Sequence, residues 1–322
     1  MNRILVIRGG AIGDFILTLP ALRALRDANP MAHIEILGYT HIAELASNRF
    51  YANQVRSIEY APLSRFFAKD SELSGELAGY FEAFDLVISY LYDPDSIFEN
   101  NLRRCGVRHI VLGRGKIEQH KHAAEQLGEP IESLGIKVSD LAPKFFPSSA
   151  DQHFAQEFLC DWARPFVVFH PGSGSERKNW PLQNWIELGN WLLTEERFDG
   201  SILVVGGEAD DVQMAKLEAV WSKPRVRFAK GLALPHLGAL LQDSVFVGHD
   251  SGISHLAAAA GARCVLLFGP TDPDVWAPRG ENVGVIRAPH GDLRALDVPT
   301  VRAAILGSAG CQPAVVGNLL TT

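Results

Sequence analysis

The sequence lacks the features that mark several large classes of protein. Its 322 residues include only four cysteines, Cys105, Cys160, Cys264 and Cys311, and no two of them have the spacing of metal ligands. We therefore expect reduced thiols in a reducing compartment, without disulfides or a zinc site. The first residues, Met1-Asn-Arg, run directly into an apolar strand, which is not the pattern of a signal peptide.

Long apolar runs and an excess of basic charge are also missing. No run reaches the roughly 20 apolar residues that a membrane-spanning helix needs. The net charge is −7, from 30 lysines and arginines against 37 aspartates and glutamates, which argues against a general nucleic-acid binder. With 47% hydrophobic and 21% charged residues, the composition predicts a soluble, cytoplasmic, globular protein that could still rest on a membrane surface.

The chain does contain apolar strands that alternate with helical patterns. Strands are expected at residues 4–7, 33–37, 57–60, 86–89, 109–112, 166–170, 201–205, 225–229 and 263–268, and near 244–247. Helices are expected at 15–25, 151–162, 182–193, 235–242, 253–260 and 296–306, with Asp14 at the start of the first. This alternation predicts an α/β protein with doubly wound sheets. The length and a proline-marked polar stretch at 143–149 predict two domains, residues 1–150 and 151–322.

The glycine-rich turn at residues 8–14 does not match the dinucleotide-binding fingerprint. Ala11 occupies the second required glycine position, and the second strand ends in Gly38-Tyr39 instead of an acidic residue. The glycines instead make a tight turn that allows a close approach of the backbone and Asp14 to another group. Asp14 is either a helix cap or a general base, because a carboxylate at the carboxyl end of a strand faces the crevice where α/β folds bind ligands. The helix dipole would keep it ionised.

Three polar stretches in the second half have the composition of an anion site. Residues 171–181 form a Gly/Ser-rich loop with Lys178, which is either a plain linker or an anion cradle. Asp250-Ser251-Gly252 precedes a helix of small apolar residues that contains His255, and its turn is either good capping or a phosphate site. Glu208 either binds a ribose or lies in a first helical turn.

A cluster of basic side chains lies in the first half of the chain. Between residues 103 and 121 six cations face one acid, Glu118. A smaller basic-aromatic patch contains Arg65 and Lys69. These side chains form either an ordinary solvated face or a surface for an acidic substrate or anionic lipid head groups.

Taken together, the motifs resemble glycosyltransferase family 9, the ADP-heptose:lipopolysaccharide heptosyltransferases. The resemblance covers most of the chain and rests on four stretches in order. These are Gly13-Asp14 with residues 18–21, residues 170–173 with 178–181, residues 206–208, and residues 250–255 with 268–271.

The resemblance implies a GT-B fold of two Rossmann-like domains that face a central cleft. It also implies an inverting transfer from a nucleotide-sugar to an acidic glycolipid acceptor at the inner membrane, without a cofactor or a tightly bound metal. Asp14 would then be the base. Ser173 and Lys178 would hold the diphosphate, Glu208 the ribose, and Asp250, Ser251, Gly252 and His255 would complete the donor pocket. Acceptor contacts are expected at Arg65, Lys69, Arg114 and Lys121.

Two other functions remain open on the sequence alone. One is a nucleotide-sugar epimerase of the same two-domain form, which would need further acid or base groups near the sugar. The other is a non-catalytic nucleotide-sugar-binding protein, against which the carboxylate of Asp14 argues.

Overall fold

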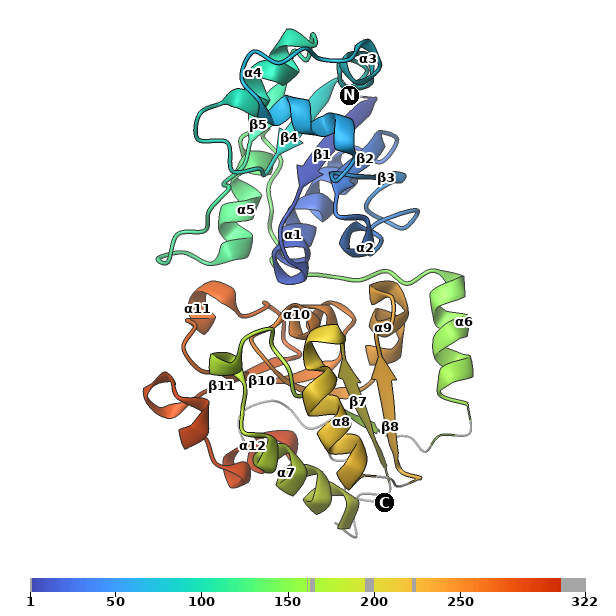
Figure 1. Ribbon diagram of the computed structural model, residues 1–322, viewed down its shortest axis with the longest axis vertical. Helices are drawn as coiled ribbons and strands as arrows, with labels where there is room; N and C mark the ends of the chain where they lie inside the picture. The colour runs from blue at the N-terminus through green and yellow to red at the C-terminus, as the bar shows by residue number, and fades with distance from the viewer. Residues whose placement is uncertain (1, 161, 163–165, 195–199, 222–223, 308–322) are drawn as a thin grey trace. The chain divides into compact units, whose positions relative to one another are not determined.

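The computed structural model describes residues 2–160, 162, 166–194, 200–221 and 224–307. The chain divides into two compact units, Met1–Leu141 and Ala142–Thr322 (Figure 1). The first unit ends before residue 150, the boundary expected from the sequence. The polar stretch 143–149 already belongs to the second unit, where the Phe145 N–H donates to the Ala259 carbonyl at 2.8 Å. Cys311 lies outside the described residues. No helix within the described ranges is long and apolar enough to cross a membrane.

The first unit contains a five-stranded parallel sheet in the order β3-β2-β1-β4-β5. Its strands are β1 (Arg3–Arg8), β2 (His33–Gly38), β3 (Gln54–Ser57), β4 (Leu86–Ser89) and β5 (Ile110–Leu112). Its helices are α1 (Ile12–Ala28), α2 (Thr40–Ala43), α3 (Gly75–Glu82), α4 (Ile97–Arg104), α5 (Ala123–Glu132) and the 3-10 helix η1 (Ala61–Phe67).

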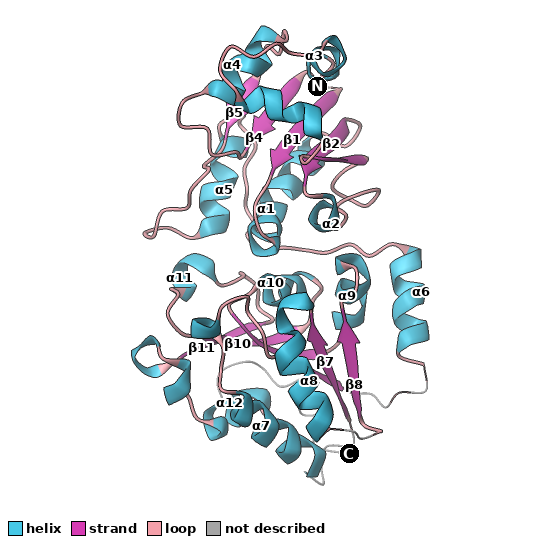
Figure 2. Ribbon diagram, viewed as in Figure 1, coloured by secondary structure: helices cyan, strands magenta, loops and turns pink. Residues whose placement is uncertain are grey.

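Helices cover both faces of this sheet because its inner strands are apolar on both sides. Residues 4–7 of β1 are all fully buried. Leu5 and Ile7 pack in one cluster with side chains of η1, α3 and α4, and α1 packs against α5 in a separate layer (Figure 2). At the β3 edge of this sheet, the prediction of a strand at residues 57–60 is wrong. The strand β3 ends at Ser57, and the chain then turns into η1.

The second unit contains a six-stranded parallel sheet in the order β11-β10-β9-β6-β7-β8. Its strands are β6 (Phe166–His170), β7 (Ser201–Gly206), β8 (Val226–Lys230), β9 (Val245–His249), β10 (Arg263–Phe268) and β11 (Val283–Arg287). Its α-helices are α6 (Ser149–Phe158), α7 (Leu182–Thr194), α8 (Asp211–Val220), α9 (Leu234–Leu241), α10 (Gly252–Ala259), α11 (Pro273–Trp276) and α12 (Val298–Ile305). Short 3-10 helices are η2 (Glu176–Lys178), η3 (Glu208–Asp210), η4 (Pro289–Gly291) and η5 (Leu293–Ala295).

The core of the second unit lies between this sheet and the helices α7, α8 and α12. Trp185, Met214 and Val301 come from these three helices and are fully buried against alternate residues of the central strands. The helices α9 and α10 pack on each other, and α6 packs on α9. Each fully buried large apolar side chain contributes about 1.5–3 kcal/mol, so this layer holds the strand ends in fixed positions.

Candidate active site

The carboxyl ends of four neighbouring strands bring most of the expected donor residues together in the second unit. The strand β6 leads into residues 171–181, β7 into Glu208, β9 into Asp250 and β10 into Thr271. The strand order reverses between β6 and β9, which pair in parallel. Open α/β sheets bind ligands outside the carboxyl ends of their strands at such a reversal. The motif residues therefore stand at the position where folds of this kind bind ligands.

Lys178 and Asp250 form the charged centre of this edge. Lys178 Nζ lies 2.7 Å from Asp250 Oδ2, and the Thr271 hydroxyl donates to the same oxygen at 2.7 Å. The ion pair is partly buried, with 31% of the lysine side chain and 11% of the aspartate side chain exposed. A cation in this position can also meet the negative charge of a bound phosphate.

Ser251 caps the helix α10, and Gly252 is its first residue. The Ser251 hydroxyl oxygen accepts from the Ser254 N–H at 3.3 Å, as a capping residue does. The first backbone N–H groups of the helix and its dipole then favour an anion at this end. His255 lies in the same first turn but is buried, with 4% of its surface exposed.

Ser173 and Glu208 lie on the loops that flank this centre. Ser173 is partly exposed, and its hydroxyl contacts Asn179 Oδ1 at 2.6 Å and the Ser175 carbonyl at 2.9 Å. Glu208 is exposed and is the first residue of η3, so it does lie in a first helical turn, one of the two positions considered for it. The Gly/Ser loop is not a plain linker, because hydrogen bonds from within and outside it fix its course.

Three further buried polar residues lie at this edge, and the sequence alone assigned no role to them. They are His170 at the end of β6, Asp210 in η3 and His249 at the end of β9. His170 Nε2 lies 3.5 Å from Asp210 Oδ2, and His170 Nδ1 lies 3.3 Å from the Ser251 hydroxyl. The Asp210 carboxylate lies so close to Gly172 that an added Cβ would approach its Oδ1 to 1.6 Å. For His170 and His249 the available signal was a histidine at the end of an apolar strand.

The electrostatics of these groups follow from burial and from their hydrogen bonds. Burial would raise the pKa of Asp210, but hydrogen bonds from His170 and from the Gly207 N–H outweigh it, so the pKa is lowered. Burial lowers the pKa of His249 to about 3, so this imidazole is neutral under ordinary conditions.

Asp14 lies at the carboxyl end of β1 in the first unit. It is the third residue of α1, which begins at Ile12 and not at Asp14 as expected. Its Oδ2 accepts from the Ala11 N–H at 3.0 Å, so the carboxylate does act as a cap. The side chain is also 36% exposed and lies 3.9 Å from the guanidinium of Arg8, a buried residue that the motifs did not identify. The first unit thus offers an accessible carboxylate close to a buried guanidinium.

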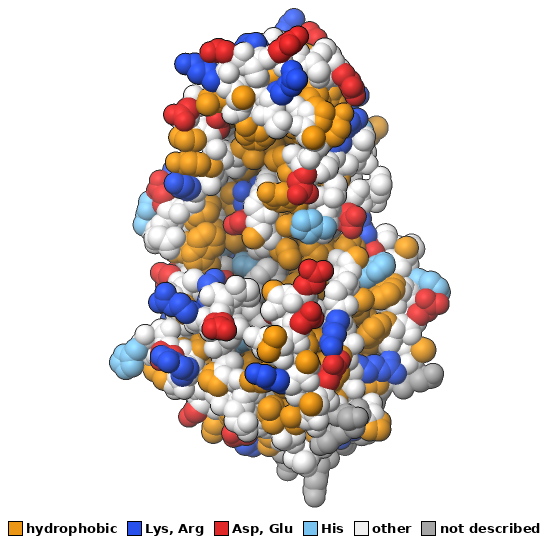
Figure 3. Space-filling view, viewed as in Figure 1, with side chains coloured by type: hydrophobic (Ala, Val, Ile, Leu, Met, Phe, Trp, Pro, Cys, Tyr) orange, Lys and Arg blue, Asp and Glu red, His pale blue; other side chains and the backbone are white. Residues whose placement is uncertain are grey.

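The four expected acceptor residues belong to two separate surface patches. Arg65 donates to the Glu72 carbonyl at 3.2 Å, and Lys69 is exposed. Arg114 and Lys121 both bind Glu129 of α5, at 2.7 Å and 3.0 Å. Figure 3 shows acidic and basic side chains interspersed on the visible face. Glu129, which lies outside residues 103–121, therefore neutralises part of the basic excess of that stretch.

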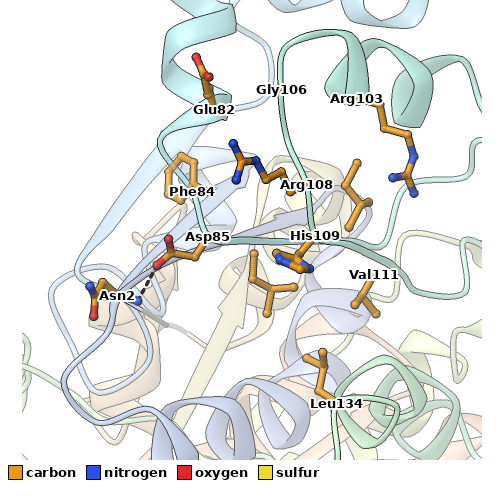
Figure 4. A pocket seen from close by; sticks show the side chains of 12 residues that line it. Asn2, Glu82, Phe84, Asp85, Arg103, Gly106, Arg108, His109, Val111 and Leu134 are labelled. Atoms are coloured by element: carbon orange, nitrogen blue, oxygen red, sulfur yellow. Dashed lines mark hydrogen bonds between the residues drawn. The ribbon is translucent and has the colours of Figure 1, made fainter.

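A cavity of about 910 Å³ lies at the opposite, amino-terminal end of the first sheet. Figure 4 shows Arg108 and His109 before β5 together with Asp85 before β4. Asp85 already accepts from the backbone N–H groups of Asn2 and Arg3, at 2.6 Å and 3.0 Å. Because ligands of such sheets bind at the carboxyl ends, this cavity is separate from the candidate site. No cluster of three or more potential metal ligands occurs among the described residues.

Comparison with known proteins agrees with the motifs. The family model for glycosyltransferase family 9 (heptosyltransferase) matches residues 115–301. Lipopolysaccharide heptosyltransferase 1 of Escherichia coli strain RS218 is 24% identical over 323 residues, which cover 94% of this chain and 97% of that protein.

Solved structures match the fold over nearly the whole chain. A family 9 glycosyltransferase from Veillonella parvula has a TM-score of 0.77 at 19% identity and covers 96% of this chain and 97% of its own. The E. coli heptosyltransferase WaaC with ADP has a TM-score of 0.72 at 23% identity, with coverage of 95% and 100%. The predicted GT-B class, with two Rossmann-like units, is confirmed.

Proposed function

This chain belongs to glycosyltransferase family 9 (heptosyltransferase) and is therefore a glycosyltransferase, and from that premise we propose that it moves a heptose from ADP-heptose to a lipopolysaccharide-core acceptor. The observation that carries the proposal is the convergence of Lys178, Asp250 and the α10 N-terminus at the strand reversal between β6 and β9. The names of the relatives support heptose and lipopolysaccharide, and the ADP in the WaaC structure supports the nucleotide.

In the proposed reaction the acceptor hydroxyl attacks the sugar carbon in a single displacement that inverts its configuration. Asp14 takes the proton of that hydroxyl. Its side chain is 36% exposed at the carboxyl end of β1, so an acceptor hydroxyl can reach the carboxylate.

The leaving ADP develops negative charge on its diphosphate. Lys178 and the free N–H groups at the start of α10 would stabilise that charge, so the proposal needs no resident metal ion. Ser173 would bind the same diphosphate, and Glu208 the ribose. Asp250, Ser251, Gly252 and His255 would shape the remainder of the donor pocket.

The acceptor is proposed to be an acidic glycolipid, which would bring the enzyme to the surface of the inner membrane. Arg65, Lys69, Arg114 and Lys121 are the candidate contacts. Since Glu129 already neutralises part of the charge of Arg114 and Lys121, an acidic acceptor would have to compete with that carboxylate.

The variant Asp14→Asn tests the base. Donor affinity should persist, while the transfer rate should fall by about 10²–10⁴-fold, the usual contribution of a general base. The matched control is Asp151→Asn, because Asp151 occupies the same capping position in α6, where its Oδ2 accepts from the Ser148 N–H at 2.7 Å. Equal transfer rates in both variants would leave Asp14 a cap and refute its role as base.

A thermal-shift series tests the donor. At equal concentration, the nucleoside diphosphates and sugars that bind the folded state more tightly should raise the melting temperature more, with ADP-heptose and ADP first. A larger shift with another nucleotide base would refute the proposed donor and leave the reaction class intact.

A further inference from the structure

The imidazole of His249 connects two segments of the candidate donor site. It is the last residue of β9, and none of its surface is exposed. The Trp180 N–H donates to its Nε2 at 2.8 Å, and its Nδ1 lies 3.3 Å from the Gly172 carbonyl oxygen. The ring of Trp185 packs edge-on against it, with centroids 5.4 Å apart.

These contacts determine where the imidazole carries its proton. A backbone N–H can only donate, so Nε2 must be the unprotonated nitrogen that accepts from Trp180. Nδ1 then carries the proton and donates to the Gly172 carbonyl. Burial lowers the pKa of this imidazole to about 3 with a further contribution from His170, and outweighs the opposing effects of the Gly172 carbonyl, Asp210 and Asp250. The imidazole is thus a neutral donor and acceptor at once.

The two bonds hold the loop of residues 171–181 near both of its ends. Gly172 is the second residue of that loop and Trp180 the last but one. Lys178 lies between them and reaches Asp250, the residue that directly follows His249. The side chain of His249 therefore connects the loop that contains Lys178 to the end of β9, which Asp250 directly follows.

We propose that His249 is a positioning residue that holds residues 171–181 in the conformation in which Lys178 meets the donor diphosphate. This inference rests on the proposed function and assigns a role to a residue outside the motifs. His249 does not touch the donor. It acts through the Gly172 carbonyl and the Trp180 N–H, which leave the loop ordered before the donor binds, and such preorganisation lowers the cost of binding.

Three substitutions of His249 test its hydrogen bonds with Trp180 and with Gly172 separately. His249→Gln keeps an acceptor near the position of Nε2, His249→Asn keeps a donor near the position of Nδ1, and His249→Phe keeps neither. Because the bond from Trp180 is the shorter one, ADP affinity by calorimetry should fall in the order wild type, Gln, Asn, Phe. We expect about tenfold weaker binding for His249→Phe, with an unchanged KM for the acceptor.

The control is Val226→Ala in β8, which removes buried apolar surface outside this loop. It should lower the melting temperature but leave ADP affinity within about twofold of wild type. Hydrogen exchange without ligand gives a readout that is independent of the donor. The amide of Trp180 should exchange faster in His249→Phe and His249→Asn than in His249→Gln and Val226→Ala.

The outcomes distinguish this inference from the proposed function. Failure of the wild-type protein to bind ADP would refute the donor, while the exchange experiment would still test the role of His249. Unchanged exchange at Trp180 in His249→Asn and His249→Phe would overturn the inference. So would an equal loss of ADP affinity in His249→Asn and Val226→Ala. If His249→Phe does not fold, the comparison of the Gln and Asn variants decides.

Discussion

Acid should destabilise the second unit through His249. The folded protein holds the pKa of this imidazole near 3, while in the unfolded chain it titrates near 6.5. Below about pH 6.5 the unfolded chain therefore binds a proton that the folded chain does not bind. The contribution of His249 to stability is complete above pH 6.5 and falls as the pH drops toward 3. The loss is about 1.4 kcal/mol per pH unit, or about 2 kcal/mol at pH 5.

Tryptophan fluorescence can follow this unit alone, because all six tryptophans of the chain lie after residue 142. Urea unfolding at several pH values should give a free energy of unfolding that falls more steeply in wild type than in His249→Gln, which has no titrating group there. The exposed His153 is the control, since 71% of its side chain is accessible and His153→Gln should leave the slope unchanged. Equal slopes in wild type and His249→Gln would refute the reasoning.

Two further variants test the surroundings of the site. Gly172→Ala places a Cβ 1.6 Å from Asp210 Oδ1, and the required shift should cost about 1–3 kcal/mol in urea unfolding. The loss of stability caused by Gly172→Ala should be smaller when Asp210→Ala is also present. If the stability losses of the two single variants simply add in the double variant, the clash is contradicted. Lys178→Ala should weaken ADP binding about tenfold, because it removes a charge-assisted contact. The exposed Lys216 of α8 provides the control, and equal affinities in Lys178→Ala and Lys216→Ala would count against the phosphate role.

The sequence predicts the inner strands and the edge strands β5 and β8 to within two residues, but it misplaces the edge strand β3 and misses the edge strand β11. The strands β1, β4 and β6 are continuous apolar runs because helices cover both faces. The edge strand β3 contains Gln54 and Arg56 and is only partly buried, so its composition does not separate it from a loop. The edge strand β11, which the sequence analysis did not identify, is partly exposed and contains Gly284.

The same limit applies to the candidate site. The motif residues Lys178 and Asp250 could be predicted because they stand in loops whose composition already indicates an anion site. The contacts of His170 with Asp210 and of His249 with Trp180 could not. Each joins segments that are far apart in the sequence, and their proximity depends on the strand order, which local patterns do not contain.

The ion pair between Lys178 and Asp250 has a consequence for turnover. A cation that already has a carboxylate partner at 2.7 Å gains less from a phosphate than an unpaired cation would. If ADP is the leaving group, as proposed, the carboxylate would compete with it for the lysine once the sugar has left. In the proposed reaction the pair would therefore limit how tightly the spent nucleotide is retained, and product inhibition would be reduced by the enzyme's own side chain.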